Sequence, residues 1–444
     1  MERKELVHGV TTSAVVLGFY VLSKFLTPAQ MSLLLLSVAF VLFFTEIIPI
    51  AFTAILVPVV LSVTGILDAN TAFSYFGYKW VIVFLFMFMV GEGLFRTGAA
   101  QKIGELVVRI SGTGEVRLML FIMVITAILS GFLSNTATTV ALLPIVVAAS
   151  RSAGISPKRM LLPLAWAASL GGTLTVIGTP PNGIVNSVLE EMNLQPFGFF
   201  EFGKIGLPLT ILGIALAVTV GRKFLPSSEA SFSGKAISEL EEVRDDKMWL
   251  AIVIFVLTIL AMMLKLLPYQ TAAALGAVLM VAFGVISAKE AFNSVSWTTV
   301  FLFAGMLPLS KAMEVTGAAE MVGKAVTGYI HSPYVLLLAI MVIAFLLGNS
   351  MSHTATTAIL SPLAVSISRS AGISPYPLLM AIAMTSSIGF WTPVSTPPNT
   401  IVFGPGEYNF MDYIKAGAVI EVVLFVALFI LIPMFYPFDF SPLT

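Results

Sequence analysis

The sequence predicts an all-α polytopic membrane protein of about 11 transmembrane helices, arranged as two inverted repeats that each hold a re-entrant hairpin and a broken helix. The 444-residue chain is 58% hydrophobic and 10% charged, with a mean hydropathy of +1.00, whereas soluble domains carry about 25% charged residues. Its apolar runs are long and uninterrupted, which favours helices over the short alternating strands of a membrane β-barrel. Its polar motifs occur twice, half a chain apart.

The internal repeat is clearest in two motifs. Residues 134–157 and 352–375 lie 218 positions apart and share 16 of 24 residues. The sequence Thr-Pro-Pro-Asn at 179–182 returns at 396–399, which is 217 positions later. Polar, helix-breaking segments inside a very apolar chain indicate a substrate site, because secondary transporters build their sites from such elements near the middle of the membrane.

Four regions are expected in chain order. They are an N-terminal extra span within residues 1–30, a first repeat over 31–222, a cytoplasmic linker over 223–247 and a second repeat over 248–444. Continuous spans, each of about 20 residues, are expected near 11–27, 31–47, 49–66, 80–97, 203–222, 248–266, 270–287, 297–315 and 417–436. Amphipathic stretches at 99–115 and 317–331 precede the two motif regions.

The charges predict the orientation. Each repeat has five spans when its broken span is counted, and an odd number inverts the second copy in the membrane. Six Lys or Arg residues lie from 102 to 159, around the first motif, but only two from 321 to 376, around the second. The positive-inside rule then puts the N-terminus in the cytoplasm and the C-terminus outside, in a plasma (inner) membrane protein.

The motif regions are expected to be re-entrant hairpins. Residues 118–150 are apolar except at their central motif, and Arg117 and Arg151 bracket them on the same expected side of the membrane. A half-helix therefore enters, turns at the motif and returns, and residues 333–368 do the same from the opposite side. Each tip leaves backbone groups without helix partners near the membrane centre, where only protein or a water-filled cavity can satisfy them.

The Thr-Pro-Pro-Asn motifs are expected to break the spans at about 161–193 and 376–402. Two consecutive prolines remove two N–H donors and stop the preceding helix. The unwound carbonyls and the Ser, Thr and Asn oxygens suit a hard cation such as Na⁺, whereas the helix N-termini suit carboxylates. Two such subsites facing each other favour a substrate with a carboxylate at each end.

These motifs resemble those of the divalent anion/sodium symporter family, the dicarboxylate and citrate transporters of the ion transporter superfamily. The resemblance covers almost the whole chain and includes residues 44–49, Phe-Thr-Glu-Ile-Ile-Pro, which are similar to a family signature in an early span. It implies a homodimer with a scaffold and a transport domain in each protomer, and an elevator-type mechanism. It also implies secondary active transport of di- or tricarboxylates of the succinate, malate, fumarate, 2-oxoglutarate or citrate class, by Na⁺-coupled symport or dicarboxylate exchange.

The resemblance also implies the site residues. Those expected to bind substrate are Asn135, Thr136, Thr179, Pro180, Ser352, His353, Thr354, Thr396 and Pro397. Those expected to bind Na⁺ are Ser134, Asn135 and Gly178 at a first site, and Ser352, His353 and Ser395 at a second. Family members commonly have Ser-Asn-Thr in both copies, so His353 is a departure. It leaves open whether the second Na⁺ site is kept and whether the chain works by symport or exchange.

Other functions have less support. A sulfate transporter or a Na⁺/H⁺ antiporter of the same superfamily is the alternative within transport, but the broken spans hold no Asp-Asp or Asp-Lys pair. A polytopic membrane enzyme could use Ser352 and His353, but neighbours on a helix project about 100° apart, so no enzyme is expected. A channel would not need a duplicated central site. The expected partners are the carboxylate, the lipid bilayer and a second copy of the chain. No organic cofactor and no nucleic acid are expected.

Overall fold

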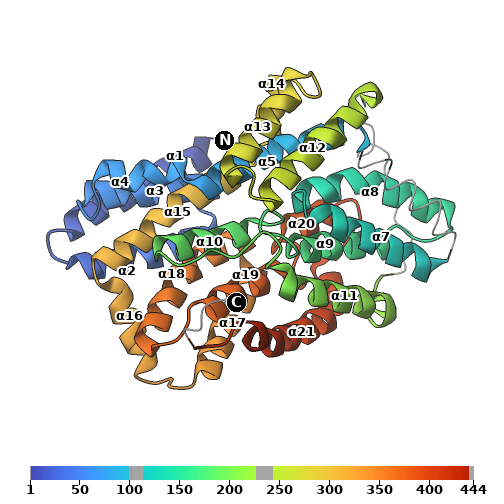
Figure 1. Ribbon diagram of the computed structural model, residues 1–444. Helices are drawn as coiled ribbons and strands as arrows, with labels where there is room; N and C mark the ends of the chain where they lie inside the picture. The colour runs from blue at the N-terminus through green and yellow to red at the C-terminus, as the bar shows by residue number, and fades with distance from the viewer. Residues whose placement is uncertain (1, 100–101, 103–113, 227–243, 440–444) are drawn as a thin grey trace.

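The computed structural model describes residues 2–99, 102, 114–226 and 244–439, and every regular element in these ranges is a helix (Figure 1). Most of the amphipathic stretch expected at 99–115 and most of the linker expected at 223–247 lie outside the described residues. The first part of the chain forms α1 to α5 at Glu2–Leu22, Pro28–Thr45, Ile50–Val63, Ala69–Ser74 and Lys79–Arg96. It continues with α7 to α11 at Glu115–Ser130, Asn135–Ser152, Lys158–Gly172, Pro180–Glu191 and Gly203–Thr219.

The second part of the chain repeats this order of helices. It begins with α12 to α16 at Met248–Met263, Tyr269–Ala282, Ala288–Ser294, Trp297–Val315 and Ala318–Thr327. It ends with α17 to α21 at Pro333–Ser350, His353–Ala371, Tyr376–Ser387, Pro397–Phe403 and Phe410–Phe435. Each expected hairpin is therefore a pair of helices, α7–α8 and α17–α18, and each expected broken span is also a pair, α9–α10 and α19–α20.

Long apolar helices confirm a membrane protein, although they are fewer than the continuous spans expected. Among the described residues, six helices are long and apolar enough to cross a bilayer: 28–45, 69–96, 203–223, 245–263, 333–350 and 410–435. A seventh is added if α14 and α15, bent by 58°, count as one span. The spans expected at 49–66 and 270–287 are shorter helices of 14 residues each, because glycine-containing turns end α3 and α13 early.

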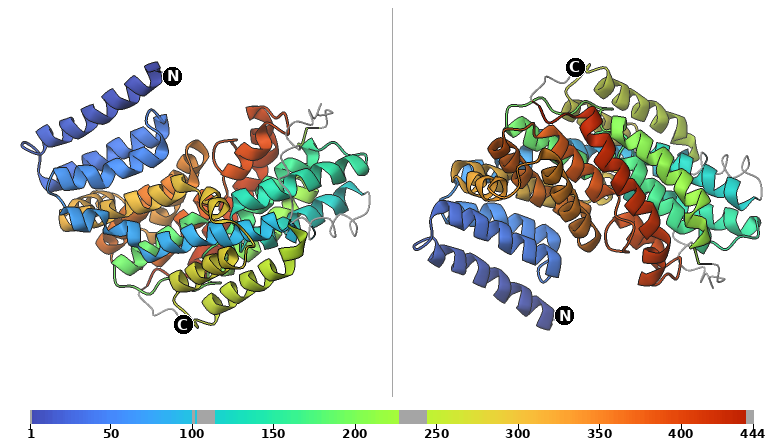
Figure 2. Two further views of the ribbon diagram at one scale, coloured as in Figure 1. Left: turned by 90° about the horizontal axis from the view of Figure 1, so that it is seen from above. Right: turned by 90° about the horizontal axis from the view of Figure 1, so that it is seen from below.

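Helices from the two halves of the chain pack against each other. Helix α15 packs against α3, and its counterpart α5 packs against α13. Each hairpin packs on the broken span of its own half, α7 against α9 and α17 against α19. Figure 2 shows α1 and α2 at one end of the molecule and α7 and α8 at the opposite end. The breaks and the hairpin tips lie between these ends.

The centre of the molecule is unusually rich in small polar side chains. Nearly every residue of α9, α18 and α19 is buried. Many of the Ser and Thr hydroxyls there donate to the carbonyl four residues earlier, as Thr139 does to Asn135 and Thr357 to His353. Buried hydroxyls that are paired in this way carry little desolvation cost. The interior is therefore rich in neutral polar groups, which suits a site for ions and water.

Candidate functional site

The two hairpin tips are helix N-termini that are capped by the serine of each motif. Ser134 precedes α8 and its hydroxyl accepts from the Ala137 N–H at 3.1 Å. Ser352 precedes α18 and accepts from the Ala355 N–H at 3.2 Å. A serine N-cap satisfies one of the free N–H groups of the first turn. The next two residues of each motif therefore stand in the first turn of a helix, where the dipole favours anions.

The two breaks are held open by the asparagine of each Thr-Pro-Pro-Asn motif. The helix pairs are interrupted at 173–179 and 388–396. In the first break, Asn182 Nδ2 donates to the carbonyls of Gly172 at 3.2 Å and Thr175 at 2.8 Å. In the second, Asn399 Nδ2 donates to the carbonyls of Gly389 at 3.0 Å and Thr392 at 2.9 Å. The asparagine replaces helix partners that the unwound carbonyls have lost.

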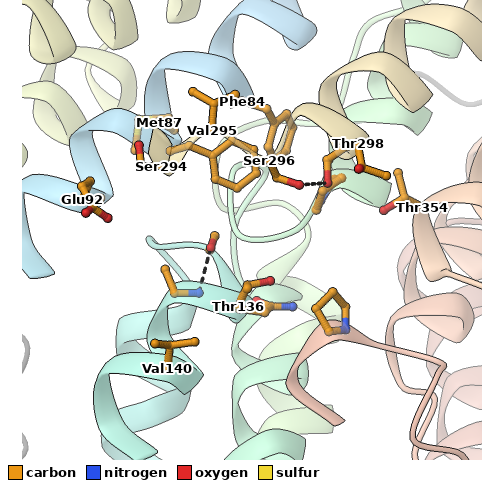
Figure 3. A pocket seen from close by; sticks show the side chains of 18 of the residues that line it. Phe84, Met87, Glu92, Thr136, Val140, Ser294, Val295, Ser296, Thr298 and Thr354 are labelled. Atoms are coloured by element: carbon orange, nitrogen blue, oxygen red, sulfur yellow. Dashed lines mark hydrogen bonds between the residues drawn. The ribbon is translucent and has the colours of Figure 1, made fainter. Parts of the chain in front are cut away.

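Both tips, the first break and the N-terminus of α20, which follows the second break, meet at one cavity of about 720 Å³. The predicted residues that line it are Ser134, Asn135, Thr136, Gly178, Pro180, Ser352, His353, Thr354 and Pro397. The opposite wall comes from α5 and from residues 293–302. Figure 3 shows Thr136 and Thr354 on different elements beside the same space, with Phe84, Met87 and Val295 across from Thr136. Residues that are more than 200 positions apart in the chain thus share one chamber.

Three predicted site residues lie beneath the surface of this cavity. Thr179 and Ser395 are fully buried and Thr396 is 1% exposed, and none of the three is among the described residues that line the cavity. The hydroxyl of Thr396 accepts from Ser169 at 3.4 Å, and that of Ser395 donates to the Gly389 carbonyl at 2.8 Å. In this state they support the wall of the cavity and do not form its surface.

Oxygen atoms converge on the side chain of Asn135. Its carboxamide lies 3.1 Å from the Ala168 carbonyl, 3.2 Å from the Gly178 carbonyl and 2.7 Å from the Ser130 hydroxyl. With its nitrogen turned inward, Asn135 donates to these three oxygens. With its oxygen turned inward, the group becomes a cluster of four neutral oxygens, which is the ligand type that a hard cation prefers. The chemistry of this donor set therefore fits Na⁺, with Ser130 and Ala168 as neighbours that sequence analysis did not predict.

Two glycines allow Asn135 to reach this position. A Cβ on Gly172 would lie 2.5 Å from the Asn135 Oδ1, and a Cβ on Gly178 would lie 2.5 Å from the Gly172 carbonyl oxygen. Both distances are below any normal contact. Only glycine therefore lets the first break approach the tip of the first hairpin this closely.

The second copy replaces this asparagine by an imidazole. His353 is 5% exposed and lies against the backbone of Ser395, and its Nδ1 has no hydrogen-bond partner among the described residues. Ser395 is 217 positions after Gly178, so both tips contact the equivalent residue of their break. An imidazole offers nitrogen and no oxygen. The second half of the site therefore lacks the amide oxygen that would complete a cluster like that of Asn135.

Ion pairs distinguish the two ends of the cavity wall formed by α5. At its C-terminal end, Arg96 pairs with Glu92 at 2.6 Å, and both line the cavity. Arg244, near the end of the linker, donates from its backbone to the Arg96 carbonyl and pairs with Glu290 at 2.9 Å. The cavity therefore extends from the tips towards the linker side of the molecule.

At the N-terminal end of α5, ion pairs and a hydrogen bond connect neighbouring helices. Lys79 pairs with Glu190 of α10 at 2.5 Å, and Tyr78 donates to the same carboxylate at 3.2 Å. Arg369 of α18 pairs with Glu314 of α15 at 3.3 Å. These contacts join the broken span and the hairpin to α5 and α15 on the side away from the linker.

A buried carboxylate near the second half of the site was missed by sequence analysis. Glu421 of α21 is fully buried and accepts from the Asn349 Nδ2 at 2.5 Å and from the Phe390 N–H at 2.6 Å. The signal was present, because Glu421 is the only charged residue between positions 416 and 435. An ionisable residue inside a span is a functional candidate by default.

Comparison with known proteins shows which family and which fold the chain resembles. The model of a family described as citrate transporter matches residues 40–368 and 330–442. The chain is 24% identical to the uncharacterized transporter YfbS of Escherichia coli (strain K12), over 91% of this chain and 98% of that protein. It is 26% identical to the sodium-dependent dicarboxylate transporter SdcS of Staphylococcus saprophyticus, over 88% and 83%. Among solved structures, Neisseria gonorrhoeae MtrF, one of a class of antimetabolite efflux pumps, shares the fold with a TM-score of 0.56 and 14% identity, over 84% and 83%.

Proposed function

The chain belongs to the citrate transporter family, and from this premise we propose that it is a secondary active transporter of di- or tricarboxylates. The substrate crosses the plasma membrane by alternating access, with Na⁺ as a coupling ion or by exchange of one dicarboxylate for another. The observation that carries the proposal is the meeting of two hairpin tips, the first break and the N-terminus of α20 at one cavity. The sodium-dependent dicarboxylate transporter SdcS, which aligns over most of both chains, supports the same substrate class.

The substrate binds between the two capped helices. The first turns of α8 and α18 present N–H groups and the hydroxyls of Thr136 and Thr354 to the cavity. Helix N-termini of this kind bind carboxylates without needing a cation. The one acidic side chain among the described lining residues, Glu92, is paired with Arg96. A dicarboxylate bridging the two tips would therefore meet donors at both ends and no unpaired negative charge.

Sodium binds beside Asn135. Turning the carboxamide oxygen inward gives Na⁺ four neutral oxygens, and these lie directly behind the tip that binds one carboxylate. The ion would neutralise part of the substrate charge and hold the tip against the break. The ion and the substrate would both fix the first turn of α8. Binding of either one would therefore strengthen binding of the other.

The transport step is a movement of the hairpins and broken spans against the remaining helices. The moving unit comprises α7 to α11 and α17 to α21, and the scaffold comprises α1 to α5 and α12 to α16, which also form the homodimer contact. The ion pairs that join α10 and α18 to α5 and α15 close the side away from the linker, while the cavity reaches the linker side. With the linker in the cytoplasm, this is the inward-facing state.

The test is uptake by the purified chain in liposomes. Labelled succinate should enter when a Na⁺ gradient or internal dicarboxylate is supplied, and Asn135→Ala should abolish it. Asn70→Ala, which removes an exposed asparagine from α4, is the matched control and should leave uptake unchanged. Absence of uptake of every dicarboxylate under both conditions contradicts the proposal. Uptake of labelled sulfate together with no uptake of any dicarboxylate would instead assign an inorganic anion.

A further inference from the structure

We infer that Glu421 is a positioning residue for the second half of the substrate site: its carboxylate fixes the tip of the second hairpin and the second break relative to each other. The inference rests on the proposed function, because it gives a residue outside the cavity a role in how substrate is held. Glu421 is not among the described residues that line the cavity. It acts through a chain of hydrogen bonds that ends at Ser395, whose backbone lies against His353.

The first link joins α21 to the break and to the hairpin. One carboxylate oxygen of Glu421 accepts from the Asn349 side chain at 2.5 Å, and the other accepts from the Phe390 N–H at 2.6 Å. Asn349 is the second-last residue of α17, two positions before the tip. Phe390 lies in the unwound segment 388–396. A single side chain therefore holds two elements that each lead directly into residues lining the cavity, Ser352 after α17 and Pro397 after the break.

The next links run from Asn349 along the break. Asn349 Oδ1 accepts from the Trp391 N–H at 3.2 Å, and its backbone carbonyl accepts from the Thr392 hydroxyl at 2.8 Å. The same hydroxyl accepts from the Ser395 N–H at 3.2 Å. The backbone of Ser395 lies against the imidazole of His353, which lines the cavity. Displacement of Glu421 would therefore be transmitted to the cavity wall.

The first copy lacks this charged support. The positions equivalent to Asn349 and Glu421 are Gly131 and Thr210, at offsets of 218 and 211 residues. Thr175 donates to the Gly131 carbonyl as Thr392 does to that of Asn349, so one link is common to both copies. The hydroxyl of Thr210, however, donates to the Leu170 carbonyl and makes no contact with the tip among the described residues. Support by a buried carboxylate is specific to the copy that carries His353.

The direction of each bond makes the network testable. Both groups that hydrogen-bond to Glu421 among the described residues are donors, so Glu421→Gln leaves its amide N–H₂ facing a donor. If the Asn349 carboxamide flips so that its oxygen accepts from the new amide, the Asn349 nitrogen then faces the Trp391 N–H. Exchanging the two groups, Glu421→Gln with Asn349→Asp, restores an acceptor for every N–H named above. The exchange loses the bond from Asn349 to the Phe345 carbonyl, so recovery should be partial.

The experiment compares both single variants, the exchanged pair and the control Thr210→Val in proteoliposomes. An unpaired buried donor should raise the KM for succinate about tenfold in Glu421→Gln, with a smaller change in maximal rate. The exchanged pair should recover most of that loss, and Thr210→Val should stay near the parent. A KM for Glu421→Gln equal to that of the parent, or an exchanged pair as impaired as the worse single variant, overturns the inference.

A second measurement separates this inference from the proposed function. The chain has no cysteine, so Ser395→Cys supplies a unique thiol in the buried break. Maleimide should label it slowly, and several times faster when Glu421→Gln is added, whether or not succinate is a substrate. An unchanged labelling rate overturns the inference even if transport is observed. If the Glu421 variants are not obtained as folded protein, Thr392→Val is combined with Ser395→Cys in their place. An unchanged labelling rate in that double variant also overturns the inference.

Discussion

Asn182 and Asn399 hold their breaks with the same pair of bonds. Each side-chain nitrogen donates to the carbonyls ten and seven residues earlier, at 3.2 and 2.8 Å for Asn182 and at 3.0 and 2.9 Å for Asn399. Both asparagines are fully buried. Two segments 217 positions apart therefore keep one local geometry, which shows that the motif encodes the shape of the break and not only its position.

Replacing either asparagine by alanine should destabilise its break. Asn399→Ala leaves the carbonyls of Gly389 and Thr392 without their donor, and each buried unpaired group costs about 1–3 kcal/mol. We expect a loss of about 2–4 kcal/mol in unfolding free energy, with a similar loss for Asn182→Ala. Thermal unfolding of the solubilised protein measures this. A large effect in one copy and none in the other would contradict the equivalence of the two breaks.

Gly172→Ala should impair cation binding. Its Cβ would lie 2.5 Å from Asn135 Oδ1, so the carboxamide must move away from the Gly178 and Ala168 carbonyls. We expect the half-saturating Na⁺ concentration for uptake to rise by about tenfold or more, since a displaced ligand costs at least about 1.4 kcal/mol. Gly404→Ala is the control, because nothing lies within 4 Å of its Cβ. A normal Na⁺ response in Gly172→Ala would remove Asn135 from the cation site.

The local part of the site could be predicted from the sequence. Ser134 and Ser352 were expected at turns, and they are N-caps, a role that depends on residues within one turn of the chain. The breaks could also be predicted, because prolines stop helices wherever they occur. Placement in three dimensions could not. Thr179 and Thr396 were expected to touch substrate but lie beneath the wall, since burial is decided by how distant helices pack.

The role of Glu421 shows a second limit of sequence reasoning. Its hydrogen-bond partner Asn349 is 72 residues away and belongs to neither of the repeated motifs. The repeat itself draws attention to positions that match between copies, whereas Glu421 and Asn349 differ from their counterparts, Thr210 and Gly131. A search for residues that the two copies share does not find residues that differ between them. Such differences nevertheless decide how the two halves of the site differ.

His353→Asn should add a cation requirement. An asparagine there can place an oxygen beside the Ser395 backbone, as Asn135 does beside that of Gly178. We expect a parent whose uptake depends on Na⁺ hyperbolically, or not at all, and a variant with a steeper Na⁺ dependence. The comparison is counterflow in proteoliposomes with and without Na⁺. His331→Asn, which changes an exposed histidine, is the matched control. An identical Na⁺ dependence in parent and His353→Asn would show that the imidazole does not replace a cation.

Breaking the contact between Lys79 and Glu190 should shift the balance of conformations away from the inward-facing state. The pair joins α5 to α10 on the side that this state closes, at 2.5 Å, with side-chain exposures of 37% and 14%. Partly exposed pairs are worth about 0.2–1 kcal/mol, so Lys79→Met should reduce the inward-facing to outward-facing ratio by roughly two- to fivefold. Labelling of Thr298→Cys from the linker side should slow by that factor, because Thr298 lines the cavity.

Lys324→Met removes an equal charge from a pair within α16, which does not cross between moving and fixed helices, and should leave the rate unchanged. Equal slowing in both variants would mean that surface charge, and not the contact between α5 and α10, sets the balance.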